Sequence, residues 1–387
     1  MHSALHFGAG NIGRGFLGQL YSESGWHTTF VDVNPALVDA LNKKKCYPLT
    51  LVGAHSETRN ITPVSALNAA DEDAIGAAFV RADLVSTAVG ANILAKIAPV
   101  FALAIAQRAT KRPEPINVIL CENLLDAAAI FRAAIKLHLP QRFHAFLDDQ
   151  VGLVEASVGR MVPVQQGEES RHPLEVRVEP YCTLPVDAEA FRGPIPAIQH
   201  MEPRENFKAY VARKLYVHNM SHAATAYLGA LKGHTYIWEA IGDPEINGWV
   251  REAIEESAAA LHRKFDLNLD ELRAHGEDLL FRYTNQGLAD QVERVARDPL
   301  RKLSPGDRFV GALNLCEEQG LPCGAIARAV GAALCYTNPS DPESMGLQEA
   351  ICEIGVERLL LTHCLLQSGS GSMSAVLDAY AQLTAHP

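Results

Sequence analysis

The sequence predicts an α/β protein in which a doubly wound parallel sheet is followed by a mostly α-helical C-terminal domain. Three observations predict this class. A glycine-rich turn follows the first apolar strand, strands and helices alternate up to about residue 150, and apolar residues recur at helical spacing from about residue 206 onward. We therefore expect two domains, comprising residues 1–195 and 196–387.

The composition indicates a globular protein that binds small molecules. The chain has 387 residues, of which 48% are hydrophobic, and its formal net charge is −11. Because an acidic surface repels nucleic acid and anionic membranes, we expect neither as a partner. This charge still permits a local basic pocket for one small anion. We expect a monomer or a weak homo-oligomer.

The cysteines and the N-terminus point to the cytoplasm. None of the eight cysteines is spaced C-x-x-C and no histidine pair completes a zinc pattern, so we expect reduced thiols and no metal. The N-terminal MHSALHFGAG lacks a charged stretch followed by an apolar run, so no signal peptide is expected. We find no run of about 20 apolar residues, and hence expect no membrane span.

The strongest local motif is the turn Gly8-Ala9-Gly10-Asn11-Ile12-Gly13, between a strand at 4–7 and a helix that starts near Arg14. This is the context in which G-x-G-x-x-G binds a dinucleotide. Gly8 permits a tight turn, Gly10 lets the backbone approach a pyrophosphate, and Gly13 allows close packing of helix and strand. The helix N-terminus supplies amide donors for the phosphates.

Asp32 ends the next strand, residues 27–33. A carboxylate at this position accepts hydrogen bonds from the hydroxyls of an adenosine ribose and repels a 2′-phosphate. Val33 and Asn34 follow, and neither could hold such a phosphate. The sequence therefore favours NAD over NADP, and the alternative is a structural turn with a solvated aspartate.

Two later strands also end in polar residues. The segment 82–90 ends with Thr87 and Gly90, and the segment 116–131 changes from strand to helix after Cys121-Glu122-Asn123. Ligands of open α/β sheets bind at such carboxyl ends, so we expect Thr87 and Gly90 at the cofactor and Asn123 near the crevice. Asn123 is equally suited to be a helix N-cap, and its position alone does not decide between these roles.

The second half is predicted to be helical. After a few extended strands in 151–195 and a linker at 194–203, helical spacing covers 206–230, 244–265, 311–337 and 346–366. We expect a flexible loop at 368–374 and then a short last helix.

Four polar side chains cluster in KLYVHNMSH, residues 214–222. On an α-helix with Lys214 at 0°, His218, His222 and Asn219 fall at about 40°, 80° and 140°. The four therefore share one flank of an apolar helix and could line a crevice. A surface lysine beside capping or core histidines would give the same spacing, and the spacing does not separate these interpretations.

A basic stretch at 282–308 includes Arg297, Arg301 and Lys302, which are candidates for holding a substrate phosphate. Guanidinium groups suit the geometry of phosphate and carboxylate. The alternative is a solvated helix face with paired charges.

The motifs together give the whole chain a resemblance to the polyol-specific long-chain dehydrogenases. The resemblance rests on HFGAGNIGRGFLG, CENLLDAA and RDPLRKLSPGDR, and on the family motif K-x4-N-x2-H, which Lys214, Asn219 and His222 match without gaps. Asn123 matches the family's asparagine in its E/D-N-L segment. The resemblance implies an expanded Rossmann domain followed by a helical domain, with the active site between them.

The resemblance also implies metal-independent hydride transfer to NAD. It makes Lys214 the general base that takes the alcohol proton, Asn123 and Asn219 the donors that hold the developing alkoxide, and His222 the residue that orients or tunes the lysine. These residue types suit the reaction because the oxygen gains negative charge as the hydride leaves. A lysine with its ordinary pKa of about 10 is a poor base at neutral pH, so we expect desolvation to lower the pKa of Lys214.

One motif departs from the family pattern. The signature V-D-R-[IV]-x-P is replaced here by Val158-Gly159-Arg160-Met161-Val162-Pro163, so Gly159 stands where relatives have an aspartate near the active site. Either Glu155 or His218 compensates for it, or the substrate differs.

Three functional hypotheses follow. In length and motifs the chain is most similar to family members that reversibly oxidise D-mannitol 1-phosphate to D-fructose 6-phosphate with NAD. The second hypothesis is a dehydrogenase of another polyol or a hexonate, such as mannitol, arabinitol or altronate. The third is a regulatory protein that binds NAD without turnover, against which the lysine–asparagine–histidine set argues.

Overall fold

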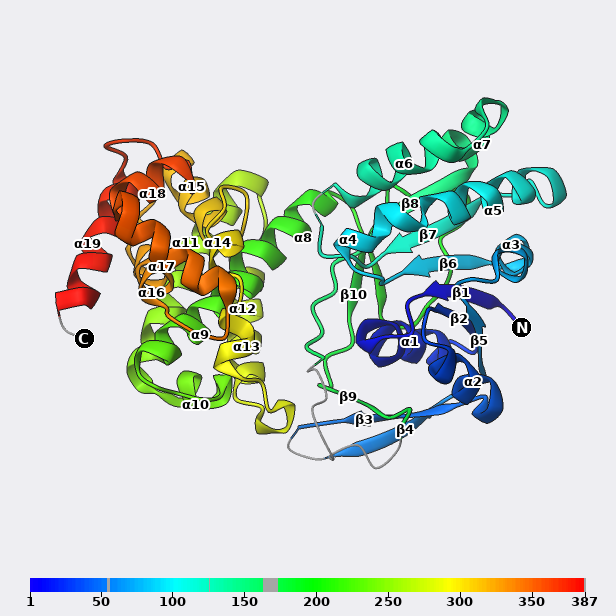
Figure 1. Ribbon diagram of the computed structural model, residues 1–387, viewed down its shortest axis with the longest axis horizontal. Coiled ribbons are helices and arrows are strands. Elements are labelled where there is room, and N and C mark those ends of the chain that lie inside the picture. Colours follow the sequence, from blue (N-terminus) through cyan, green and yellow to red (C-terminus); the bar gives the residue numbers. More distant parts are fainter. Residues whose placement is uncertain (54–55, 125, 163–172, 386–387) are drawn as a thin grey trace. The chain divides into compact units, whose positions relative to one another are not determined.

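The computed structural model describes residues 1–53, 56–124, 126–162 and 173–385, which form two compact units, Met1–Phe207 and Lys208–Pro387 (Figure 1). The first unit extends beyond residue 195 because strand β11 (Met201–Arg204) pairs in parallel with β10 (Leu184–Asp187). Each unit is described by itself below.

The first unit is built on a six-stranded parallel sheet, as the sequence predicts. Its spatial order is β5-β2-β1-β6-β7-β8. From β1 the chain adds β2 and β5 on one side and β6, β7 and β8 on the other, so the strand order switches between β1 and β6. In open α/β sheets the ligand crevice lies beyond the carboxyl ends of the two strands at this point. The strands are β1 (Ser3–Phe7), β2 (His27–Asp32), β5 (Val64–Asn68), β6 (Leu84–Thr87), β7 (Ile116–Leu120) and β8 (Val151–Glu155).

Both faces of this sheet are buried under helices. Leu5 and Phe7 of β1 pack with α3 (Glu72–Arg81), α5 (Ala98–Lys111) and α6 (Ala127–His138). Ala4 points the other way, toward η1 (Gly13–Leu17) and α1 (Gly18–Glu23). This alternation is the period-two pattern of a strand, and burial on both faces explains its continuous apolar sequence.

The sequence analysis missed a second, three-stranded sheet of order β4-β3-β9. It consists of β3 (Tyr47–Leu51), β4 (Glu57–Ile61) and β9 (Val176–Val178). The strands predicted in 151–195 exist, but β8, β9 and β10 join three different sheets. The remaining helices of this unit are α2 (Pro35–Lys44), α4 (Ala91–Leu94), η2 (Ala95–Ile97), η3 (Gln141–Phe143) and α7 (His144–Gln150).

The continuous helical stretch Ala91–Lys111 is long and apolar enough, by length and composition alone, to cross a membrane. This differs from the expectation that no such run exists. The stretch contributes Phe101, Ala104 and Ile105 to the core under the sheet, where it packs on α3 and α6. Core helices pass the same test, so this single feature is weak evidence for a span.

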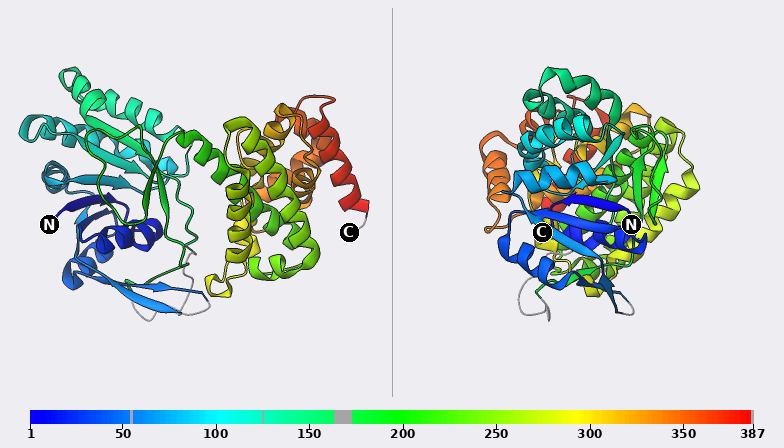
Figure 2. Two further views of the ribbon diagram at one scale, coloured as in Figure 1. Left: turned by 180° about the vertical axis from the view of Figure 1, so that it is seen from behind. Right: turned by 90° about the vertical axis from the view of Figure 1, so that its right-hand side faces the viewer.

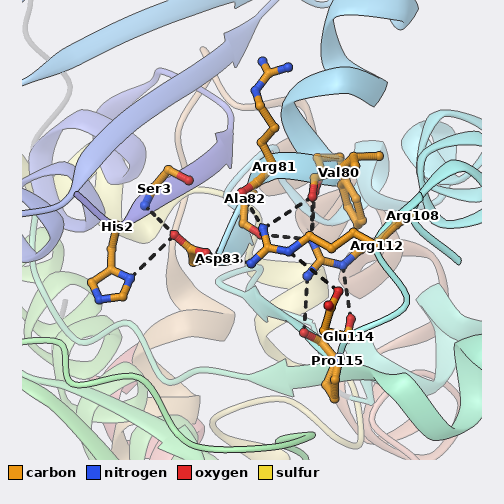
Figure 3. A network of polar contacts seen from close by, with 11 residues as sticks. His2, Ser3, Val80, Arg81, Ala82, Asp83, Arg108, Arg112, Glu114 and Pro115 are labelled. Carbon is orange, nitrogen blue, oxygen red and sulfur yellow. Dashed lines mark hydrogen bonds and ion pairs between the residues drawn. The ribbon is translucent and has the colours of Figure 1, made fainter. Parts of the chain in front are cut away.

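Arg108 of α5 and Arg112, the C-cap residue of that helix, hold the chain that leads into β6, as Figure 3 shows. The buried Arg108 donates to the carbonyl oxygens of Phe79, Val80 and Ala82 at 2.9–3.2 Å, and Arg112 donates to Asp83 at 3.0 Å. A cation at the C-terminus of α3 satisfies its last carbonyls and its dipole. The start of β6 is thereby fixed from outside the sheet.

The second unit, green to red in Figure 2, consists of helices in its described residues, as predicted. The last helix begins at Gly371, inside the expected loop, and is longer than expected. The helices are α8 (Phe207–Arg213), η4 (Lys214–Asn219), α9 (Met220–Leu231), α10 (Ile237–Gly242), α11 (Pro244–Phe265), α12 (Leu269–Tyr283), η5 (Gln286–Leu288), α13 (Val292–Ala296), α14 (Pro299–Lys302), α15 (Val310–Glu318), α16 (Gly324–Cys335), α17 (Pro342–Ile354), α18 (Val356–Thr362) and α19 (Gly371–Ala385).

Candidate active site

The three glycines of the turn after β1 differ in the space around them. Gly8 has a φ of +100°, and a Cβ there would lie 2.6 Å from the carbonyl oxygen of Ala88. A Cβ on Gly13 would lie 1.9 Å from the carbonyl oxygen of Gly8. A Cβ on the exposed Gly10 would meet nothing within 4 Å. Gly8 and Gly13 are therefore required by the protein itself, whereas the bare backbone at Gly10 leaves room for a ligand.

Asp32 links this turn to the end of β2. Its Oδ2 accepts a hydrogen bond from the backbone N–H of Ala9 at 2.7 Å, and its Oδ1 accepts one from Asn34 N–H at 2.9 Å. Each carboxylate oxygen can accept a further hydrogen bond. Asn34 caps α2 through its side-chain oxygen, and Val33 is 80% exposed beside Asp32. Asn11 and Ile12 form the half-buried start of the following helix.

After Asn11 and Ile12 that helix continues as a π-helical turn, η1, where a regular helix was expected. The Tyr47 hydroxyl donates to the carbonyl oxygen of Arg14 at 2.7 Å, and Arg160 donates to that of Gly15 at 3.0 Å. Side chains that occupy helix carbonyls are a known cause of such distortions. Arg160 also donates to Gln19 and to the carbonyl oxygen of Glu179. Arg160, the arginine of the V-G-R-M segment, is therefore occupied by hydrogen bonds inside the protein. Pro163 of the same motif lies outside the described residues.

The loop after β6 is held by Glu122, a residue to which the sequence analysis gave no role. The hydroxyl of Thr87 donates to Oε2 of Glu122 at 2.7 Å, and the backbone N–H of Val89 donates to Oε1 at 3.0 Å. Glu122 is buried, and burial raises its pKa against these hydrogen bonds. Thr87 was predicted to bind the cofactor, but its hydroxyl hydrogen is donated to Glu122. Gly90 is exposed at the start of α4 with a φ of +94°.

Asn123 lies in the loop that follows Glu122. The residue at the N-cap position of α6 is Asp126, so the alternative of Asn123 as the cap of that helix is wrong. The Asn123 side chain is exposed at the carboxyl end of β7.

In the second unit, Lys214 and Asn219 begin and end a single π-helical turn, η4. The helical projection at 3.6 residues per turn was therefore wrong for this segment. A π-helix joins residues i and i+5 by its hydrogen bonds, so it brings residues five apart closer to one side than an α-helix does. Lys214 and Asn219 have this spacing. Isolated π-turns occur frequently at functional sites.

His222, one turn further along, is held by a hydrogen bond to a carboxylate that was not predicted from the sequence. Its Nε2 lies 3.0 Å from Oδ2 of Asp290, and its ring stacks on Tyr283 with the ring centroids 5.0 Å apart. Asp290 in turn accepts two hydrogen bonds from Arg294 at 2.8 and 2.5 Å. No sequence signal marked this pairing, because Asp290 and His222 are separated by 68 residues.

His218 has a different environment from His222. It is buried, and burial lowers its pKa well below the ordinary value, with the positive charge of Arg282 acting in the same direction. A neutral His218 carries no charge, unlike the aspartate that the family motif has at the position of Gly159. Glu155, the other candidate, accepts a hydrogen bond from the backbone N–H of Ala128 at 3.0 Å and so serves the first turn of α6.

The three predicted phosphate ligands lie in unlike surroundings. Lys302 is 4% exposed, and burial, together with Arg308 and Arg301, lowers its pKa to about 7. Arg301 is half-exposed and pairs with Asp307 at 3.2 Å and with Asp298 at 3.7 Å. Arg297 is exposed. Only Lys302 is therefore a buried cation of the kind that a desolvated anion would need.

Comparison with known proteins agrees with this architecture. The model of the mannitol dehydrogenase Rossmann domain matches residues 2–200, and that of the mannitol dehydrogenase C-terminal domain matches residues 206–361. The chain belongs to the mannitol dehydrogenase family. The family resemblance inferred from the motifs is thereby confirmed.

Two solved structures share the fold of this chain. The structure of Pseudomonas fluorescens mannitol 2-dehydrogenase, in a ternary complex with NAD and D-mannitol, is 19% identical and matches over 99% of this chain and 92% of that chain, with a TM-score of 0.74. A D-sorbitol dehydrogenase in substrate-free form is 15% identical, with a TM-score of 0.82 over 98% of this chain and 93% of that chain. Identities this low show a common fold only.

Proposed function

We propose that this protein catalyses the reversible, NAD-dependent oxidation of D-mannitol 1-phosphate at C5 to D-fructose 6-phosphate. The observation that carries the proposal is the pairing of two features of the second unit. Lys214, Asn219 and His222 lie on and just after a π-turn, and the same unit contains the buried cation Lys302. The first feature suits alcohol oxidation and the second suits an anionic substrate.

The turn after β1 fits NAD. The open space at Gly10 accommodates a pyrophosphate, and the N–H groups of Asn11, Ile12 and Gly13 are in the first helical turn, where anions bind. Asp32 has lone pairs left for the ribose hydroxyls, and the exposed Val33 offers an apolar surface to the base. NAD, when bound, supplies the hydride acceptor.

The protein's own residues move the proton and hold the oxygen. In the direction of oxidation, Lys214 as a neutral amine takes the proton of the C5 hydroxyl. The side-chain amides of Asn219 and Asn123 donate to the same oxygen, on which negative charge develops as the carbon–hydrogen bond breaks. In the reverse direction the Lys214 ammonium returns the proton. No step requires a metal ion.

A second candidate is the oxidation of an unphosphorylated polyol or a hexonate. The family's solved relatives include a mannitol 2-dehydrogenase complex with D-mannitol, and Gly159 departs from the family motif at an expected carboxylate. A hexonate would also satisfy Lys302, whereas a neutral polyol would not. We further propose a cytoplasmic location, with which eight free thiols agree, and a monomer or weak homo-oligomer.

The deciding experiment follows NADH absorbance with mannitol 1-phosphate, mannitol, arabinitol, altronate and other sugar phosphates. The proposal predicts turnover of mannitol 1-phosphate and little of the rest. Activity confined to an unphosphorylated compound would overturn the substrate assignment. Tight NAD binding without turnover of any compound would instead indicate a sensor.

Lys214→Ala tests the mechanism. Loss of a general base lowers kcat by roughly 10²–10⁴-fold, and NAD affinity should be unchanged. Lys208→Ala, at an exposed position on α8, is the matched control and should retain activity. Near-normal turnover and an unchanged pH profile in Lys214→Ala would disprove the assignment.

A further inference from the structure

We infer that Asp290 is a positioning residue of the proposed reaction: it fixes the His222 imidazole with the proton on Nε2 and so leaves Nδ1 as a hydrogen-bond acceptor for the reaction centre. The inference rests on the proposed function, because it assigns His222 a partner within that mechanism. It adds to it a residue that is distant in sequence and that no motif singles out.

The two oxygens of the Asp290 carboxylate have separate partners. Oδ2 lies 3.0 Å from Nε2 of His222, and Oδ1 accepts both hydrogen bonds from Arg294. An ionised carboxylate can only accept hydrogen bonds, so Nε2 must be the donor in this pair. In the neutral imidazole the other nitrogen, Nδ1, is then an acceptor.

Asp290 is ionised at neutral pH. It is 6% exposed, and although burial alone would raise its pKa, the hydrogen bonds from His222 and Arg294 and the charge of Arg294 outweigh burial and lower it. A buried carboxylate with two charged or polar partners is a stable acceptor. Asp290 therefore imposes one tautomer on His222 rather than following it.

The backbone around Asp290 is fixed as well. Its carbonyl oxygen accepts a hydrogen bond from Ile237 N–H at 2.8 Å, and Val292 N–H donates to Thr235 at 2.9 Å. These bonds flank an antiparallel bridge between Tyr236 and Gln291. The carboxylate is thus presented from a short paired segment rather than from a free loop.

The imidazole ring is also held on its face. Tyr283 stacks on it, with an interplanar angle of 14°, and the Tyr283 hydroxyl lies 2.9 Å from the Ser221 hydroxyl and 3.1 Å from the carbonyl oxygen of His218. The ring therefore cannot tilt without losing the stacking on Tyr283, and it cannot flip without losing the hydrogen bond to Asp290. Within the described part of the chain, Nε2 is the one ring nitrogen of His222 with a hydrogen-bond partner, so Nδ1 is the nitrogen left for Lys214 or the substrate.

The test is the substitution Asp290→Asn, which keeps the shape and removes the charge. The asparagine amide has one acceptor oxygen and one donor NH₂ group. If the NH₂ group faces His222, Nε2 must become the acceptor and the tautomer reverses. If it faces Arg294, two N–H donors oppose each other and that bond is lost. Loss of the carboxylate partner of a metal-bound histidine typically costs roughly 10–100-fold in activity; by analogy we expect a fall of that size in kcat, with little change in NAD affinity. Nitrogen-15 NMR of the His222 ring, identified by its absence in His222→Gln, should show the Nε2–H form in the wild type and lose it in Asp290→Asn.

Two controls separate positioning from general damage. Asp270→Asn makes the same chemical change at a 93% exposed carboxylate of the second unit and should behave as the wild type. Arg294→Gln keeps the carboxylate and should keep the Nε2–H signal, with a smaller loss of kcat.

The outcomes are distinct from those of the proposed function. An Nδ1–H tautomer in the wild type overturns the inference even if Asp290→Asn does not fold, as does an Asp290→Asn enzyme with normal kcat and an unchanged tautomer. Absence of polyol oxidation by the wild type overturns the proposed function instead, and the wild-type tautomer still reports on Asp290.

Discussion

At the scale of single residues, Gly10 is the glycine of the motif at which a substitution can affect cofactor binding without affecting folding. A substitution at Gly8 or Gly13 would disturb the fold itself, because a Cβ at Gly13 would lie 1.9 Å from a backbone oxygen and Gly8 has a positive φ. At Gly10 a methyl group meets only open space, which in the proposed function is the space of the pyrophosphate. The sequence motif does not distinguish the three glycines, but the structure shows that Gly10 alone is not required by the surrounding protein.

Gly10→Ala should therefore fold normally and bind NAD weakly. We expect a free energy of unfolding within about 0.5 kcal/mol of the wild type and at least a tenfold rise in the NAD dissociation constant, measured by calorimetric titration. Gly248→Ala, in an equally open position on α11, is the matched control and should leave NAD binding unchanged. Unaltered NAD affinity in Gly10→Ala would show that the turn does not hold the pyrophosphate.

Lys302 gives the second residue-scale prediction. Its pKa of about 7 means that the amine is charged below pH 7 and increasingly neutral above it. If it binds the substrate phosphate, the KM for mannitol 1-phosphate should rise between pH 6.5 and 8, by at most tenfold per pH unit. Lys302→Arg carries a fixed charge and should flatten this rise. Since titration of the phosphate itself affects both enzymes, superimposable KM profiles would remove Lys302 from the phosphate site.

At the scale of elements, the loops after β1 and β6 are positioned by side chains from elsewhere. Glu122 holds Thr87 and Val89, and Tyr47 and Arg160 occupy the carbonyls of η1. The sequence correctly predicted the strand, turn and helix around Gly8, because those depend on neighbouring residues. It could not predict the π-turn, because Tyr47 and Arg160 lie 33 and 145 residues from the groups they bind.

Glu122→Gln tests whether the β6–α4 loop is held for the cofactor. A glutamine can accept from Val89 N–H through its oxygen and donate its NH₂ group to the Thr87 hydroxyl, but both bonds then lose the charged acceptor and the Thr87 bond is reversed. Loss of a hydrogen bond to a charged group costs about 1.5–3 kcal/mol, and we expect NAD affinity to fall about tenfold or more. Glu114→Gln, at an exposed side chain just before β7, is the control. If both variants bind NAD equally well, Glu122 serves stability alone.

The contrast between features set by neighbouring residues and features set by distant ones also applies to the candidate catalytic residues. The spacing of Lys214, Asn219 and His222 is local and was found from the sequence, through the family motif. The partner of His222 was not, because a loop 68 residues away brings Asp290 to it. The sequence identifies the cationic residues of the basic stretch, but it does not show which of them are buried. Burial distinguishes Lys302 from Arg297 and Arg301.

At the scale of the whole molecule, the missed sheet shows the same limit. Strands β3 and β4 carry a mixed pattern that gave no clear periodicity, and their sheet is completed by β9, with Thr50 bonded to Glu175 at a separation of 125 residues. The doubly wound order was predictable because each strand–helix unit is continuous in sequence. Pairing across such separations is a property of the folded chain.

Three histidines, the buried His6 and His218 and the half-buried His275, lead to a prediction about the stability of the whole chain. Burial lowers the pKa of His6 in the first unit and of His275 in the second to about 3, and lowers that of His218 well below its ordinary value. In the unfolded chain all three take up protons below about pH 6.5. The unfolded state then binds more protons than the folded state, so stability falls as pH falls, by about 1.4 kcal/mol per pH unit for each histidine that stays neutral.

We therefore expect the urea midpoint to drop steeply between pH 6.5 and 5. The raised pKa values of Glu122 and Glu256 act in the opposite direction as the pH falls toward 4.5, because these carboxyls take up protons in the folded state before they do in the unfolded chain. His6→Asn can still bond to the Ser86 hydroxyl, which lies 2.6 Å from Nδ1, but does not titrate. It should reduce the pH slope of the midpoint, whatever its effect on the midpoint itself. The same change at the exposed His138 should leave the slope unchanged, and equal slopes in all three proteins would mean that His6 is protonated in the folded state.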